Sequence, residues 1–70
     1  MKQIQKEIGE INRLHDASRK TESPFLKRDY KKAIVRKILN LKEYCRYRGL
    51  NFEDAIDGLK VRCEGGYIHI

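Results

Sequence analysis

Hydrophobic residues at helical spacing mark the start of the chain. Four aliphatic side chains recur at intervals of four, three and three residues, which places them on one face of a helix. They are Ile4, Ile8, Ile11 and Leu14. This pattern predicts a first helix over residues 2–19. Gly9 lies inside it, where glycine is unfavourable, and we expect it to let a neighbouring backbone approach closely.

A second, longer helix is predicted over residues 24–48. Ser23 followed by Pro24 is typical of an N-cap with proline in the first turn, and Gly49 is expected to end the helix in a left-handed conformation. Val35 and Leu39 fall on the flank of the apolar face, so the apolar arc is wider than one partner helix needs. The main apolar face is predicted to contain Phe25 or Leu26, Tyr30, Ala33, Ile34, Ile38, Leu41 and Cys45.

The pattern beyond Gly49 predicts a short third helix and then a change to an alternating period. Asn51 is the expected N-cap of the third helix, and Gly58 is expected to close it. Its hydrophobic side chains are expected to point one way; they are Phe52, Ile56 and Leu59.

Two short alternating runs at the end of the sequence predict a β hairpin with Gly65 and Gly66 as its turn. In that register Cys63 faces Ile68 and Val61 faces Ile70, so all four share the side that packs on the long helix. The outer face is then formed by Arg62, Glu64, Tyr67 and His69. The predicted fold is mainly α (α+β), a single domain over residues 1–70. It consists of a long antiparallel helical hairpin, a third short helix and a small C-terminal β hairpin.

Charge is unevenly distributed along the chain. The 70 residues carry 16 Lys and Arg against 10 Asp and Glu, a net charge of +6. Residues 19–37 hold eight of the basic side chains and two of the acidic ones, whereas residues 50–70 are net acidic. Such asymmetry is informative about the charge of a binding partner and not about the fold.

A basic face of the second helix is the candidate binding site. Helical geometry places Arg28, Lys32 and Arg36 opposite the apolar face. Tyr47 lies on the polar side as well, and exposed aromatic rings beside cations suit phosphates and stacked bases. The predicted site residues for a nucleic acid or an acidic partner are Arg28, Lys31, Lys32, Arg36, Lys37, Lys42, Arg46 and Tyr47.

Metal binding and catalysis are the less favoured alternatives. The two cysteines and two histidines lack the C-x-x-C and H-x-x-x-H spacings that are typical of structural zinc sites. Cys45 and His15 lie on facing seams and form a possible catalytic pair, but a helical hairpin offers little enclosed space for a reaction. A helix-turn-helix would need a recognition helix after the third helix, where Gly65 and Gly66 break helices. We therefore expect no enzyme activity, no metal and no cofactor.

Two functions remain open from the sequence. The first is a small non-enzymatic protein that binds nucleic acid, DNA or RNA, through phosphates and with little base readout. The second is a regulator or inhibitor, of the kind that phages and mobile elements encode, which docks on an acidic protein surface. A homodimer through Val35 and Leu39 is possible in either case.

The expected compartment is the cytoplasm. The first ten residues have no apolar core and no cleavage signal, so we expect no secretory leader. No apolar run approaches the ~18 residues of a membrane span, so no membrane association is expected. Two cysteines in a short chain do not indicate a disulfide framework.

Overall fold

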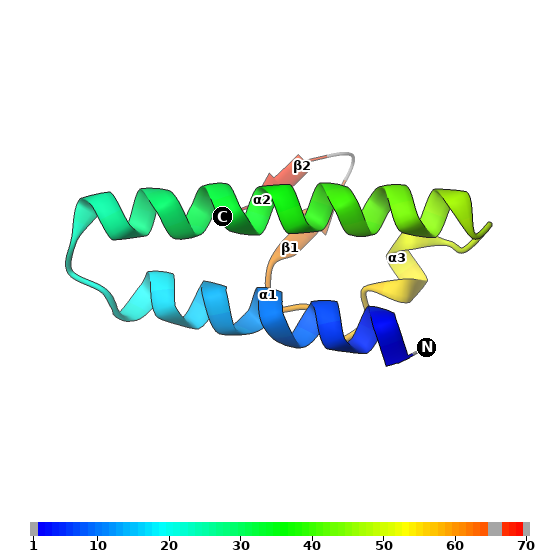
Figure 1. The fold of residues 1–70 in the computed structure, drawn as a ribbon, viewed down its shortest axis with the longest axis horizontal. Coiled ribbons are helices and arrows are strands. Elements are labelled where there is room, and N and C mark those ends of the chain that lie inside the picture. Colours follow the sequence, from blue (N-terminus) through cyan, green and yellow to red (C-terminus); the bar gives the residue numbers. More distant parts are fainter. Residues whose placement is uncertain (1, 65–66, 70) are drawn as a thin grey trace.

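Two long antiparallel helices carry most of the chain in the computed structural model, which describes residues 2–64 and 67–69. Helix α1 covers Lys2–Lys20 and helix α2 covers Pro24–Tyr47, and the two run side by side (Figure 1). Helix α3, Phe52–Ala55, packs near the end of α2, and strands β1 (Arg62–Glu64) and β2 (Tyr67–His69) form an antiparallel pair that crosses the helices near their middle. This confirms the predicted architecture of a helical hairpin, a short third helix and a terminal hairpin of strands.

The seam between α1 and α2 is the centre of the core. Ile11 and Ile34 are fully buried, and Ile38 is nearly so. Burying branched aliphatic side chains in this way gains about 1.5–3 kcal/mol for each. The core continues along both helices and into the segment before β1, with Ile4, Ile8, Leu41, Cys45 and Val61.

Side-chain caps and glycines fix where the helices begin and end. The Ser23 hydroxyl accepts a hydrogen bond from the Leu26 backbone N–H at 3.3 Å, and Asn51 Oδ1 accepts one from the Asp54 N–H at 3.3 Å. Gly49 has a φ of 69° and Gly58 a φ of 92°, which only glycine adopts without strain. The boundary signals predicted at Ser23, Gly49 and Asn51 are therefore confirmed. Gly58 does not close α3, because the helix ends at Ala55 with Ile56 as its C-cap and Gly58 lies in the turn that follows.

One asparagine holds the segment after α3 against α1. Asn12 Oδ1 accepts a hydrogen bond from the Lys60 backbone N–H at 2.8 Å, and Asn12 Nδ2 donates to the Gly58 carbonyl oxygen at 3.1 Å. These bonds join residues that are 46 and 48 positions apart in the sequence. They place Val61 over the seam, where it is buried.

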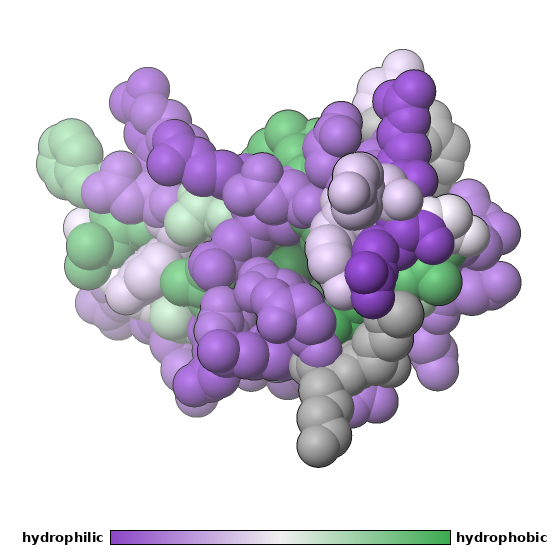
Figure 2. Space-filling view, turned by 45° about the vertical axis from the view of Figure 1, so that its right-hand side comes forward, coloured by the Kyte–Doolittle hydropathy of each residue, from purple (hydrophilic) through white to green (hydrophobic). Residues whose placement is uncertain are grey.

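The register of the β hairpin agrees with the sequence pattern. Cys63 pairs with Ile68, and both pack against the core, while Tyr67 and His69 face outward. The predicted turn at Gly65 and Gly66 and the pairing of Val61 with Ile70 lie outside the described residues. Hydrophobic residues reach the surface elsewhere as separate patches between hydrophilic side chains (Figure 2).

Two details of the predicted core are wrong. Either Phe25 or Leu26 was expected on the buried face, but the two side chains are 78% and 47% exposed. The first turn of α2 extends past the end of α1, so no partner covers it (Figure 1). A Cβ atom at Gly9 would have no neighbour within 4 Å, so Gly9 does not serve a close approach of backbones.

Two ion pairs link segments that are distant in the sequence. Lys37 Nζ contacts Glu10 Oε2 at 3.0 Å, and Lys60 Nζ contacts Asp16 Oδ2 at 2.9 Å. The hydrogen bond from Lys37 holds the pKa of Glu10 below its ordinary value of 4.5. The hydrogen bond from Lys60 holds the pKa of Asp16 below its ordinary value of 3.8.

Truncating the seam is expected to destabilise the protein strongly. Ile34→Ala and Ile38→Ala each remove buried branched carbons and should lower the free energy of unfolding by about 2–4 kcal/mol. Leu39→Ala is the matched control, because Leu39 is 50% exposed, and it should cost less than about 1 kcal/mol. Urea unfolding measures all three, and equal losses for Ile38 and Leu39 would show that the buried face is assigned wrongly.

Replacing two glycines is expected to have opposite effects. Gly9→Ala should stabilise the protein by roughly 0.5–1 kcal/mol, because alanine favours the helix and the added methyl group meets open space. Gly49→Ala should destabilise it by about 1–2 kcal/mol, because alanine is strained at a φ of 69°. A loss of thermal stability in Gly9→Ala would contradict the open surroundings of that position.

The ion pairs predict a loss of stability in acid. Folding lowers both pKa values, so their contribution is complete above the unfolded-state values of 4.5 and 3.8 and is lost as the pH falls through the folded-state values. We expect the urea concentration at the unfolding midpoint to decrease as the pH is lowered beyond about 4.5. The decrease should be smaller in the Glu10→Gln, Asp16→Asn double variant. Identical pH profiles for the two proteins would contradict this role.

Candidate functional site

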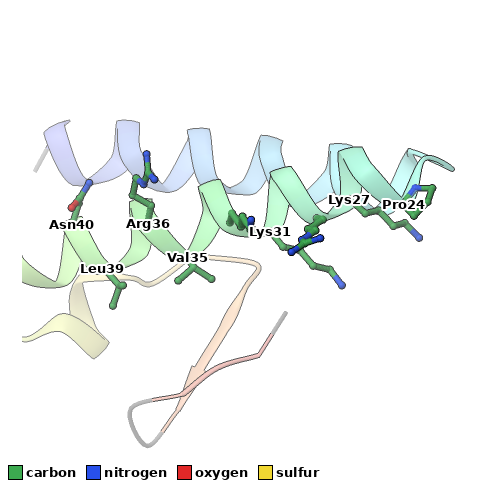
Figure 3. Close-up of a pocket in the computed structure, with 9 residues that line it drawn as sticks. Pro24, Lys27, Lys31, Val35, Arg36, Leu39 and Asn40 are labelled. Carbon is green, nitrogen blue, oxygen red and sulfur yellow. The ribbon is translucent and has the colours of Figure 1, made fainter.

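An open groove of about 880 Å³ runs along one flank of α2, and we call it the basic groove. Figure 3 shows that Val35 and Leu39 point toward the side on which the β hairpin lies, whereas Arg36 and Asn40 point away from it. The periodicity of α2 brings the lining residues to one flank, because positions three and four apart are neighbours on a helix. The groove is lined by Pro24, Lys27, Arg28, Lys31, Lys32, Val35, Arg36, Leu39 and Asn40.

Five of these side chains are exposed cations. Among the described side chains, none of the five forms an ion pair with a carboxylate. Their charges are therefore not neutralised in ion pairs, and their excess over the single nearby acid, Asp29, gives the flank a positive potential that attracts anions. The five are Lys27, Arg28, Lys31, Lys32 and Arg36.

The groove also has an apolar part. Val35 is half-buried and Leu39 is half-exposed, so neither belongs fully to the core. Leu39 also lines a smaller cavity of about 190 Å³ between α2 and the β hairpin, together with Ile68 and Tyr67. The apolar arc that the sequence left without a partner is therefore covered in part by the hairpin and open in part to the groove.

The structure brings together half of the predicted site residues. Arg28, Lys31, Lys32 and Arg36 line the basic groove. Lys37 lies on another side of α2, where it is half-buried and paired with Glu10.

The remaining predicted residues lie toward the C-terminal end of α2. Lys42 Nζ lies 5.9 Å from the centre of the Phe52 ring, in a cation–π contact. Arg46 and Tyr47 are exposed, with Arg46 about 15 Å beyond Arg36 along the helix. They do not line the basic groove.

Sequence reasoning missed Lys27 as part of this surface. Lys27 is one turn before Lys31, and its spacing of four residues was the available signal. Phe25 is exposed and follows Pro24 in the sequence, although it is not among the residues that line the groove.

A second pocket, of about 310 Å³, lies where α1 ends and α2 begins, and we call it the loop-end pocket. Lys27 and Lys31 line both this pocket and the basic groove, so the two are adjacent. From α1 it receives His15, Ser18 and Arg19.

The thiols and imidazoles are dispersed. Cys45 is fully buried and Cys63 half-buried, and burial raises the pKa of both thiols, which disfavours the reactive thiolate. His15 shares a pocket with Lys31. Cys45 lies 14 residues after Lys31 on the same helix, so about 21 Å of helix separates Cys45 from the level of this pocket. The possible pairing of Cys45 with His15 is therefore wrong. Within residues 2–64 and 67–69, no three potential metal ligands gather.

Comparison with protein-family models, with curated proteins and with solved structures found no match for this chain. In the part of the chain that the structure describes, no helix combines the length and the apolar character needed to cross a membrane. The surfaces described above are therefore the basis for assigning a function.

Proposed function

We propose that the protein is a small non-enzymatic nucleic-acid-binding protein that holds phosphates in the basic groove. The observation that carries the proposal is the set of five exposed cations without carboxylate partners on one flank of α2. Phosphate contacts from Lys and Arg supply most of the affinity of sequence-independent binding to nucleic acids.

The length of the flank suits several consecutive phosphates. Residues 27–36 span about 14 Å of helix. One strand of a duplex carries a phosphate every ~3.4 Å along its axis, so about four phosphates match this length. Five cations are enough to contact them.

The groove is better suited to holding the phosphate backbone in place than to recognising particular bases. Most of its polar side chains are Lys and Arg, which bind phosphates without regard to sequence. Phe25 is 78% exposed and is next in the sequence to Pro24, which lines the groove, so it offers a ring on which an unpaired base can stack. Single-stranded or frayed ends are therefore favoured beside Phe25.

An open groove also supports a binding role more than a catalytic one. Nucleophilic catalysis needs groups held within hydrogen-bond reach of each other, and the groove is lined mainly by long, solvated cationic side chains. The two free cysteines, Cys45 and Cys63, are consistent with a reducing cytoplasm. We therefore propose that the protein binds nucleic acid in the cytoplasm and catalyses no reaction.

The second candidate is an acidic protein partner, and the apolar residues Val35 and Leu39 favour it. A charged nucleic-acid backbone would not pack against these two apolar side chains, whereas the apolar face of an acidic amphipathic helix would cover them. A homodimer through the same residues would merge two basic flanks, so raising the salt concentration should strengthen it. Nucleic-acid binding has the opposite dependence on salt.

Binding to duplex DNA should weaken steeply with salt. About four to five phosphate contacts predict a slope of about −4 for the logarithm of the association constant against the logarithm of the salt concentration. Fluorescence anisotropy at several salt concentrations measures this slope. The absence of binding to both DNA and RNA at low salt and micromolar concentration would refute the proposal.

The same assay locates the interface. The Arg28→Glu, Lys32→Glu, Arg36→Glu variant should abolish binding while circular dichroism shows a folded chain. The control is Lys6→Glu, Arg13→Glu, Arg48→Glu, which lowers the net charge equally but lies outside the groove, and it should retain most of the affinity. Equal losses would mean that net charge, and not this flank, determines binding.

A further inference from the structure

The loop-end pocket has the composition of an anion site. Three of its five lining residues are cationic: Arg19 from α1, and Lys27 and Lys31 from α2. No carboxylate lines it, although Asp16 is close in sequence, because Asp16 pairs with Lys60 instead. A negatively charged group in the pocket would thus meet only cations and neutral polar groups.

The pocket also contains polar groups that the fold holds in its lining. Ser18 is 4% exposed and is one of the residues that line the pocket. The Nδ1 atom of His15 is buried and has no hydrogen-bond partner within the described residues. Buried polar groups are almost always paired, so an unpaired imidazole nitrogen in a pocket with three cations favours the binding of a polar or anionic group there.

We propose that the loop-end pocket binds the terminal phosphate of a nucleic-acid strand that lies in the basic groove. A terminal phosphate is a monoester with a charge of about −1.5 to −2 and three free oxygens. Three cations and a hydroxyl suit this group better than a phosphodiester, which carries one charge. Charge-assisted hydrogen bonds to Arg and Lys are the strong ones in such sites.

The position of the pocket explains why the phosphate is terminal. Lys27 and Lys31 are common to the pocket and the groove, so a strand that follows the groove can reach the pocket. His15, Ser18 and Arg19 of α1 form the wall opposite α2. A strand entering from the groove meets this wall and ends there. This inference rests on the proposed binding of nucleic acid in the groove.

The test compares single-stranded oligonucleotides that differ only in their ends. The full chain is titrated with the same labelled sequence carrying a 5′-phosphate, a 3′-phosphate or two hydroxyl ends. We expect one of the phosphorylated forms to bind about tenfold more tightly than the hydroxyl form. Equal affinities for all three would overturn this inference and leave the proposed function standing, whereas no binding at all would refute the proposed function.

Variants of the pocket separate its contribution from that of net charge. The Ser18→Ala, Arg19→Gln variant should lose the preference for a phosphorylated end, and its affinity for the hydroxyl form should stay within about twofold of that of the Ser18→Ala, Lys20→Gln variant. The Ser18→Ala, Lys20→Gln variant is the matched control, because Lys20 is next to Arg19 but does not line the pocket, and it should keep part of the preference. If the preference survives unchanged in both variants, the pocket does not hold the phosphate. A phosphoserine peptide that binds in a Ser18-dependent manner, without any preference among the oligonucleotides, would also overturn the assignment to nucleic acid.

Discussion

The antiparallel packing of α1 on α2 is the interaction on which the rest of the structure depends. Ile11 of α1 and the two residues Ile34 and Ile38 of α2 are buried between the helices. One face of α2 therefore belongs to the core. The flank of α2 that carries the basic groove is covered only in part, by the β hairpin, and its lysines and arginines remain in solvent. The same packing brings the end of α1 to the start of α2, where the loop-end pocket forms. Without the seam there would be neither a continuous basic groove nor a pocket beside it.

Much of the fold could be predicted because its signals are local. Helical spacing identified the seam, and Ser23, Gly49 and Asn51 identified the ends of the helices. Phe25 was misassigned because a helical period continues along the chain whether or not a partner helix is still present. The bonds of Asn12 to residues 58 and 60 could not be foreseen, because they depend on how distant segments meet.

The candidate site was predictable as a region but not residue by residue. The excess of positive charge in residues 19–37 is visible in the composition. The composition does not show which lysines are available to a partner. Lys37 pairs with Glu10 across the helical interface, whereas Lys27 lines both the groove and the pocket. The distinction depends on where α1 lies beside α2. Only the structure places Ser18 in one pocket with three cations.

The central claim is that anions bind along the flank of α2 that the seam leaves open. Amide chemical-shift mapping of the full chain, titrated with an oligonucleotide phosphorylated at one end in low salt, tests this claim most directly. Binding in the basic groove and the loop-end pocket should shift the amides of residues 18–19 and 27–36, with little change at Tyr47 and at residues 52–57. Shifts centred on the C-terminal end of α2 and on α3, or no shifts at all, would contradict it.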